Sequence, residues 1–156
     1  MVIENGIFSE ALSNISALPK GLEIIDIAQA TANGNYKKHF STYADVKADP
    51  FVALNTAATQ GGVFISVSKG NAVETPIHII HVASSSENAI VNPRNLVVIE
   101  ENAQAKIIES FVNVNSTAKV FNNALTEIVV GKTANVEHTK IQDETDLGYM
   151  VNTTQA

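Results

Sequence analysis

The chain has 156 residues, of which 45% are hydrophobic and 17% charged, and its formal net charge is −6 at pH 7. Its ten Lys and Arg residues are scattered, which argues against a nucleic-acid-binding surface because such surfaces depend on clustered basic side chains. The chain has no cysteine, no signal-peptide pattern and no apolar run long enough to span a membrane. We therefore expect a single cytoplasmic domain over 1–156, with neither nucleic acid nor membrane as a partner.

Residues 1–60 read as a lead-in segment without a repeat. Short strands are predicted at 2–4 and 22–27, and a loop at 31–35. A weak helix is predicted over 36–48, because Tyr36, Phe40 and Tyr43 are spaced to share one helical face. Asp49 followed by Pro50 is typical of an N-cap and first helical position, so a helix is predicted over 50–59. The segment 60–62, Gln-Gly-Gly, would end it.

Residues 61–156 read as a succession of strands. They are predicted at 63–67, 73–82, 95–99, 104–112, 125–130 and 134–142, with a seventh near 149–154. The linking loops at 83–94 and 113–124 are rich in Ser, Asn and Thr. No helical pattern of useful length lies between these strands, which excludes ordinary βαβ units.

A fixed spacing runs through this second segment. Ala72, Ala103 and Ala134 begin matching stretches and are separated by 31 residues at both steps. A constant period of this length, carried by strand-like sequence, predicts a solenoid. We therefore expect an all-β fold, a parallel β-helix (solenoid) with a small mixed α/β N-terminal segment. Residues 31 apart would then stack about 4.8 Å apart.

The period predicts which side chains become neighbours. The expected columns are Ile77 with Ile108; Val67 with Val98 and Val129; Lys106 with Glu137; and His78 with Glu109 and Lys140. Positions 106 and 109 differ in parity, so a regular strand places them on opposite faces. A bulge, or one pair lying at a corner, would bring both columns to one face.

The four histidines are His39, His78, His81 and His138. His78 and His81 lie three residues apart in a predicted strand, hence on opposite faces, and His138 likewise has its neighbours on the opposite face. A metal site needs three or four convergent donors, and no such spacing is present. We expect surface or hydrogen-bonded polar roles for all four.

The other reactive residue types also lack a catalytic pattern. Asp143, Glu144 and Asp146 are expected in a solvated loop, and Glu100 and Glu101 point in opposite directions, so neither set makes an acid–base pair. The remaining candidates are not expected to be functional. Ser84–Ser86 lacks a His or Asp at motif spacing, and Gly61, Gly62 and Gly70 form no phosphate loop. Arg94 is expected to anchor a loop, and Asn14, Asn115 and Asn152 match the glycosylation pattern, which has no meaning in a cytoplasmic protein. We assign no catalytic, cofactor-binding or metal residue.

Several motifs, in order, are similar to one known family. They are the segments 49–57 (DPFVALNTA), 62–65 (GVFI), 69–70 (KG), 76–78 (PIH), 92–103 (NPRNLVVIEENA), 122–128 (NNALTEI) and 137–138 (EH). Together they resemble the SufB/SufD family of the Suf iron–sulfur cluster assembly system over the whole chain. The likeness is closer to SufD than to SufB.

The resemblance implies a right-handed β-helix and a non-catalytic scaffold subunit. Its partners would be SufB-like and SufC-like subunits, SufC being the ATPase and SufB carrying the nascent cluster. No cofactor is expected on this chain, whereas the complex would handle the iron–sulfur cluster and, through SufC, ATP. The family's Ser-His-Gly-Ala-type motif and any cysteine are missing here, so no catalytic or metal residue carries over.

The family usually has a helical region before this segment, and further coils and a helical part after it. We therefore expect an N-terminal piece of a SufD-like β-helix, with a fourth corner near residue 165 and self-association through the exposed edge. Two alternatives stay open. One is a β-helix enzyme acting on polysaccharides, which requires carboxylates converging on one face, and the other is a purely architectural β-solenoid.

Overall fold

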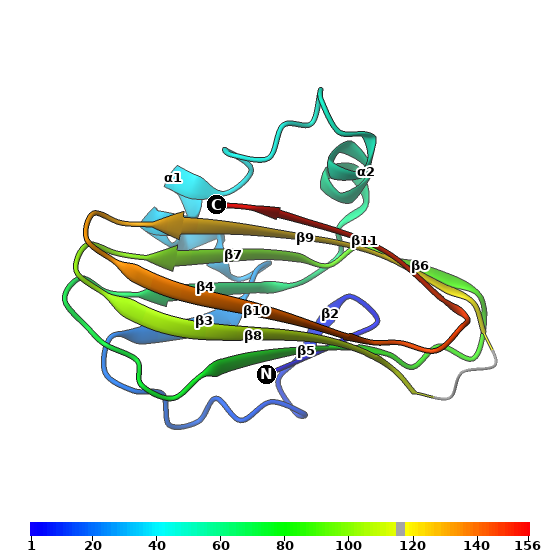
Figure 1. Cartoon of the computed structure of the whole chain (residues 1–156), viewed down its shortest axis with the longest axis horizontal. Helices are drawn as coiled ribbons and strands as arrows, with labels where there is room; N and C mark the ends of the chain where they lie inside the picture. The colour runs from blue at the N-terminus through cyan, green and yellow to red at the C-terminus, as the bar shows by residue number, and fades with distance from the viewer. Residues whose placement is uncertain (115–117) are drawn as a thin grey trace.

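The computed structural model describes residues 1–114 and 118–156, in which two β-sheets face each other (Figure 1). Sheet A has the strand order β10-β8-β5-β1-β2. Its strands are β1 (Val2–Glu4), β2 (Ile7–Ser9), β5 (Ile77–Ala83), β8 (Gln104–Asn113) and β10 (Asn135–Asp143). Sheet B has the order β11-β9-β7-β4-β3, with β6 also paired to β9. Its strands are β3 (Leu22–Asp26), β4 (Val63–Val67), β6 (Ala89–Val91), β7 (Arg94–Ile99), β9 (Val120–Val130) and β11 (Gly148–Gln155).

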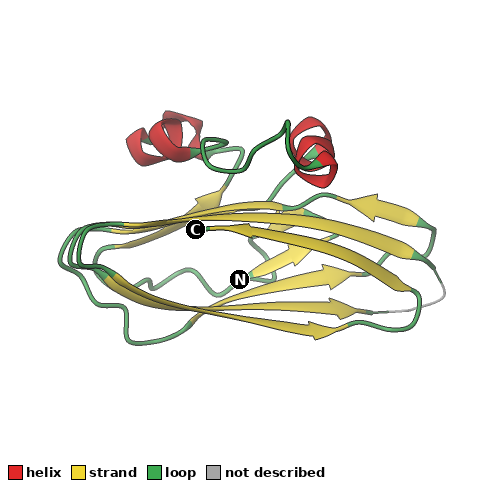
Figure 2. Ribbon diagram, turned by 45° about the horizontal axis from the view of Figure 1, so that its top comes forward, coloured by secondary structure: helices red, strands yellow, loops and turns green. Residues whose placement is uncertain are grey.

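Both sheets are mixed. From β4 onward the strands pair in parallel, whereas β1 pairs antiparallel with β2, and β3 pairs antiparallel with β4. Helices cover the outer face of sheet B, on one side of the molecule (Figure 2). The prediction of an all-β, right-handed parallel β-helix is therefore wrong, because the chain is mixed α/β with two mixed sheets. The repeat describes only the later strands, and the first 60 residues add antiparallel strands and helices to them.

The 31-residue spacing holds in part of the pairing. Strands β8 and β10 pair residues 31 apart, and so do β7 and β9, which confirms the Lys106–Glu137, Glu109–Lys140 and Val98–Val129 neighbours. Other ladders depart from this spacing, because paired residues are 32 apart between β4 and β7, 30 apart between β5 and β8, and 28 apart between β9 and β11. Val67 pairs with Ile99, Ile77 with Ile107 and His78 with Ile108, so those predicted columns are wrong. The connections between strands therefore differ in length by one to three residues from one repeat to the next.

The parity difficulty disappears in the structure. The β8–β10 register is regular from Gln104 to Val112, with no bulge. Lys106 and Glu137 lie on the solvent face of sheet A, 3.2 Å apart and both largely exposed. Glu109 and Lys140 lie on the opposite face, toward the interior. The two charge pairs simply occupy opposite faces of the same two strands.

Three short helices precede β4: η1 (Ala30–Ala32), α1 (Gly34–His39) and α2 (Pro50–Ala58). The helix predicted over 36–48 is mostly wrong. Helix α1 ends at His39, and two residues later Ser41 takes a left-handed backbone that no helix continues through. The second helix is confirmed, because the Asp49 carboxylate accepts hydrogen bonds from the N–H groups of Phe51 and Val52 and so caps α2.

Two apolar layers hold these elements together. The larger lies between the sheets and is made of Val, Ile and Ala side chains, including Ile65, Val97 and Ile107. The smaller lies on the outer face of sheet B, where Phe64 and Leu96 pack against the lead-in helices. Strands β4 and β7 are consequently buried on both faces, which explains their continuous apolar sequences.

Some of the predicted strand and loop boundaries are also wrong. Strands β2 and β6 were not predicted, and the 83–94 loop contains β6 and the first residue of β7. The 113–124 loop prediction fails from Val120, where β9 begins, while residues 115–117 of that loop, with the Asn115 pattern, lie outside the described residues.

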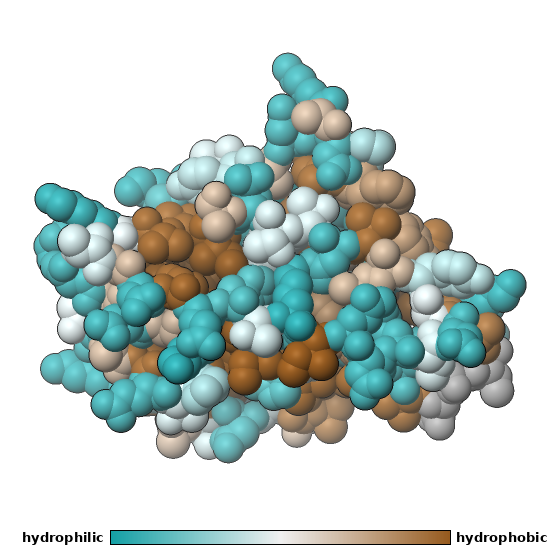
Figure 3. Space-filling model, viewed as in Figure 1, coloured by the Kyte–Doolittle hydropathy of each residue, from teal (hydrophilic) through white to brown (hydrophobic). Residues whose placement is uncertain are grey.

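On the face shown in Figure 3, apolar side chains form separate patches among polar ones. Within the described residues, no helix has the length and apolar character to cross a membrane. The division at residue 60 stays a prediction.

Candidate functional site: a buried carboxylate cluster

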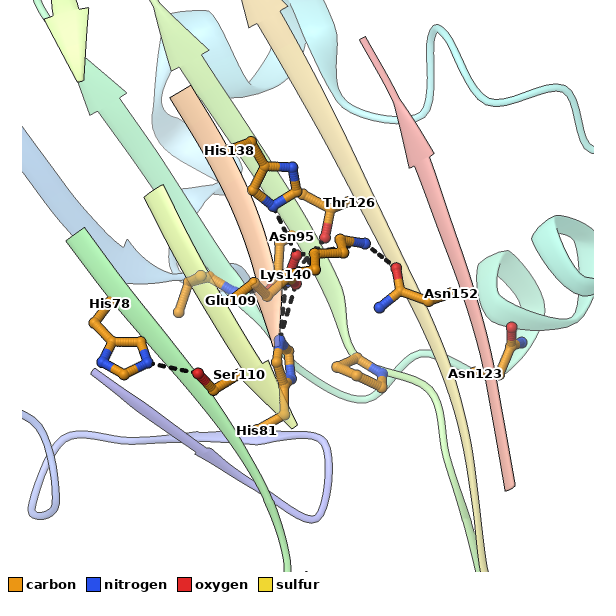
Figure 4. Close-up of polar contacts among 12 residues, drawn as sticks. His78, His81, Asn95, Glu109, Ser110, Asn123, Thr126, His138, Lys140 and Asn152 are labelled. Atoms are coloured by element: carbon orange, nitrogen blue, oxygen red, sulfur yellow. Dashed lines mark hydrogen bonds and ion pairs between the residues drawn. The ribbon is translucent and has the colours of Figure 1, made fainter. Parts of the chain in front are cut away.

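A group of polar side chains lies between the two sheets, around the carboxylate of Glu109 (Figure 4). We call it the Glu109 cluster. It consists of Glu109 on β8, His81 on β5, His138 and Lys140 on β10, Asn95 on β7, and Thr126 on β9. Strand alternation turns all six inward, so strands of both sheets contribute to one site.

Three donors bind one oxygen of Glu109. Its Oε1 accepts hydrogen bonds from His81 Nε2 at 3.0 Å, Asn95 Nδ2 at 2.9 Å and the Thr126 hydroxyl at 2.9 Å. Asn95 and Thr126 come from sheet B, whereas Glu109 and His81 come from sheet A. This oxygen therefore ties the two sheets to each other across the interior.

The second oxygen faces the edge strand. Glu109 Oε2 accepts a hydrogen bond from His138 Nε2 at 3.0 Å and lies 3.5 Å from Lys140 Nζ. Lys140 also donates to Asn152 Oδ1 on β11, in the other sheet. The Glu109 side chain is fully buried, whereas that of Lys140 is 27% exposed. The cluster thus leads from the closed interior to solvent at the β10–β11 end.

These contacts set the charge of Glu109. Burial alone would raise its pKa, but hydrogen bonds from His138 and His81, together with attraction to His81 and Lys140, hold the pKa well below its usual range. Burial lowers the pKa of Lys140, and Glu109 partly offsets that effect. An ionised carboxylate is an acceptor only, so each imidazole donates its Nε2–H to Glu109.

His81 is the most enclosed of the histidines. Its ring stacks on Phe111 with the ring centroids 4.3 Å apart and the planes nearly parallel. Its Nδ1 is buried without a hydrogen-bond partner among the described residues. His81 and His138 approach different oxygens of one carboxylate. Across residues 1–114 and 118–156, no group of three or more His, Asp or Glu side chains is placed to hold a metal ion.

The structure separates the other histidines from this site. His78 is exposed on the outer face of sheet A, opposite in direction to His81 as predicted, and its Nε2 lies 2.8 Å from the Ser110 hydroxyl. His39 ends α1 and contacts the Tyr43 hydroxyl. The sequence had indicated the Glu109–Lys140 pair, but not His81 or His138 as its neighbours.

A second buried carboxylate lies on the other side of sheet B. Glu127 Oε2 is 2.8 Å from an Arg94 nitrogen, and both side chains are fully buried. Glu127 also accepts hydrogen bonds from the backbone N–H groups of Ser41, Tyr43 and Ala44, which pins the loop between α1 and α2. The prediction of Arg94 as a loop anchor is wrong in placement, because Arg94 begins β7; its side chain donates to Glu127 and to Thr56 of α2 and lies over the Phe40 ring.

The remaining acidic candidates stay apart. Asp143 ends β10, and Glu144 and Asp146 follow it in the connection to β11. Glu100 accepts hydrogen bonds from Asn35 and from the backbone of Lys69, and Glu101 pairs with the Lys69 side chain. Of the Ser84–Ser86 run, Ser84 donates to Glu4. These contacts join neighbouring segments.

Comparison with known proteins now adds to this geometry. Residues 1–79 match the family model described as the SufBD protein N-terminal region, and residues 81–156 match the SufBD core domain of the SUF system for FeS cluster assembly. The chain belongs to the SufBD family. Among curated SufBD relatives, an iron–sulfur cluster assembly SufBD family protein of Synechocystis sp. is 30% identical over 99% of the chain and 36% of its own length.

Further SufBD family proteins of iron–sulfur cluster assembly come from Staphylococcus aureus. The one from strain MRSA252 is 33% identical over 69% of this chain, and the one from strain N315 is 32% identical over the same share. The chain spans only 23% of their length, and about a third of the Synechocystis protein. The two family models establish the family, whose core domain is described as part of the SUF system for FeS cluster assembly.

The site offers no support for a polysaccharide-cleaving SufBD protein. Glycosidic cleavage needs two carboxyl groups flanking a substrate. Glu109 lies between the two sheets, whereas Glu127 lies on the outer side of sheet B. Each carboxylate is fully buried, and both of its oxygens accept hydrogen bonds from the protein. These two carboxylates cannot share a substrate.

Proposed function

We propose that this SufBD chain belongs to a non-catalytic scaffold subunit of SufD type, acting in a SufB–SufC–SufD type complex in the cytoplasm. The match of both family models over nearly the whole chain carries the proposal. These 156 residues contain no cysteine and so offer no thiolate, the ligand that iron–sulfur clusters prefer. The proposal assigns no cofactor to this chain, and leaves the cluster and ATP to its partners.

The interior chemistry fits a scaffold. The polar side chains of the Glu109 cluster bind one another rather than an open cavity, and they join β5, β7, β8, β9 and β10. Both oxygens of the buried Glu109 carboxylate accept hydrogen bonds, and such bonds hold the strands that they join in one arrangement. A subunit that holds partners in fixed positions needs that property more than it needs a reactive group.

Co-purification tests the proposal. The complete gene product would carry an affinity tag and be isolated from its native cells, with the bound proteins identified by mass spectrometry. We expect an ATPase subunit and a cysteine-bearing SufBD relative, both absent from a control with an unrelated tagged protein. Recovery of neither would reject the complex, and full activity of cluster-dependent enzymes in cells lacking the gene would reject the assembly role.

We also propose that this chain, produced alone, associates with itself through β10 and β11, which are edge strands in the structure. Strand β11 carries no charged residue along Gly148–Gln155, and charged side chains are the usual protection of an edge. Sedimentation should show a concentration-dependent dimer that a Val151→Lys change weakens. A monomer at all concentrations would contradict this.

A further inference from the structure

Lys140 and Asn152 bring an amine and a carboxamide together beside a buried carboxylate. Lys140 lies on β10 and Asn152 on β11, so the contact joins sheet A to sheet B near the solvent-exposed end of the Glu109 cluster (Figure 4). Lys140 Nζ donates to Asn152 Oδ1, which is bonded to the amide carbon Cγ. A small rotation of either side chain therefore brings the nitrogen onto that carbon.

Two details of this contact go beyond an ordinary hydrogen bond. The Asn152 Nδ2 group is buried and has no hydrogen-bond partner among the described residues. Leaving such a donor unsatisfied costs free energy that its departure would recover. In addition, Glu109 Oε2 lies 3.5 Å from Lys140 Nζ, within reach of a proton leaving that nitrogen.

We propose that Lys140 and Asn152 form an intramolecular amide bond, with Glu109 as the group that moves the proton. Nothing outside the chain is needed. Lys140 first loses a proton to solvent, and the neutral Nζ attacks Cγ of Asn152. Glu109 takes a proton from the attacking nitrogen and later releases it to solvent, while solvent supplies a proton to Nδ2. The Cγ–Nδ2 bond then breaks, ammonia leaves, and a Lys–Asn amide joins the two sheets with no change in oxidation state.

The surroundings favour the attack. Holding two reacting groups in contact replaces a bimolecular encounter, which lowers the entropic part of the barrier. Partial burial activates a lysine as a nucleophile because it favours the neutral amine, and the pKa of Lys140 is indeed lowered by burial. The titratable groups facing Lys140 are Glu109 and, through that carboxylate, His138 and His81.

The attacking amine must be neutral, and Glu109 is a weak base because its pKa is held low. We therefore expect the reaction to be slow near neutrality and faster in alkali, as solvent removes the Lys140 proton. The rate should rise severalfold for each unit between about pH 7 and about pH 9, below the ordinary lysine pKa of about 10.4.

Intact-mass spectrometry of the purified chain tests the proposal. We expect the mass to fall by that of one ammonia molecule during incubation in the folded state, but not in denaturant. Trypsin adds a second readout, because Lys140 is the one lysine in 133–156. The amide blocks cleavage after Lys140, so 133–156 should stay one looped peptide. Ammonia loss with normal cleavage there would indicate a cyclised asparagine and would overturn the proposal.

Variants separate the roles. Lys140→Arg keeps the positive charge but should abolish the mass loss, and so should Asn152→Ala. Lys106→Arg is the matched control, because Lys106 lies on the neighbouring strand β8 in an exposed pair, and it should react as the parent does. Glu109→Gln should slow the reaction at least tenfold while circular dichroism confirms the fold. An unchanged mass in the parent after prolonged alkaline incubation would refute the bond.

Discussion

Replacing Glu109 by glutamine removes a buried charge while keeping the shape of the side chain. The remaining amide oxygen can still accept from His81, Asn95 and Thr126, but the new NH₂ group would meet the donors of His138 and Lys140. Breaking a buried ion pair by removing one partner costs about 3–5 kcal/mol. We expect Glu109→Gln to lower the free energy of unfolding by that amount at neutral pH.

Urea denaturation measures this difference. Glu137→Gln is the matched control, because Glu137 forms the same kind of pair with Lys106 on the same two strands but in solvent, where such pairs contribute less than about 1 kcal/mol. Both variants should also be measured with Asn152→Ala, which cannot form the proposed amide. If Glu109→Gln lowers the free energy of unfolding by less than about 1 kcal/mol, the charge of Glu109 does not stabilise the contact between the two sheets.

The pH dependence gives an independent check. The pKa of Glu109 is lower in the folded state than in the unfolded chain. The stabilisation is therefore complete above the unfolded value of about 4.3 and is lost as the pH falls toward the folded value. We expect the difference between parent and Glu109→Gln to be constant near neutrality and to shrink below about pH 4. A difference that persists in acid would contradict this sign.

Three further predictions concern the backbone and the second carboxylate. Gly62→Ala should lower the free energy of unfolding by about 3 kcal/mol or more, because a Cβ there would lie 1.8 Å from the Arg94 carbonyl oxygen. Gly34→Ala is the control: its Cβ would meet nothing within 4 Å, so thermal unfolding should show an unchanged or higher stability. Arg94→Met should cost about 3–5 kcal/mol in urea unfolding, because it leaves a buried carboxylate unpaired. Thr133→Asn should raise the free energy of unfolding by about 0.5–1 kcal/mol, because Thr133 has a left-handed backbone that asparagine tolerates and the corresponding Asn102 already adopts; a lower melting temperature would contradict it.

The later strands were predictable because their signal is repeated. The 31-residue spacing indicated which residues of β8 and β10 pair with each other, and the structure agrees from Gln104 to Val112. Helix α2 was predictable from its local capping sequence at Asp49 and Pro50. Strands of three residues such as β2 and β6 carry too few residues to show a period, and their pairing depends on distant partners.

The site was less accessible to sequence reasoning. Glu109 and Lys140 belong to one ladder, so their contact follows from spacing alone. Asn95 and Thr126 reach Glu109 from the opposite sheet, and nothing in a periodic pattern says which residues meet across an interior. Glu127 differs again, because its donors include backbone N–H groups of the lead-in loop, which lies outside the repeat.

The two buried carboxylates have complementary places in the architecture. Glu109 joins sheet A to sheet B, while Glu127 joins sheet B to the loop that carries the helices. Buried ion pairs add little net stability over apolar side chains, but they tolerate only one arrangement, because any misplacement leaves a charge unpaired. A chain made of similar repeats risks pairing its strands one repeat out of register. Each such mispairing would leave one of these two carboxylates buried without its partner. We therefore infer that Glu109 and Glu127 help to restrict this SufBD chain to a single register.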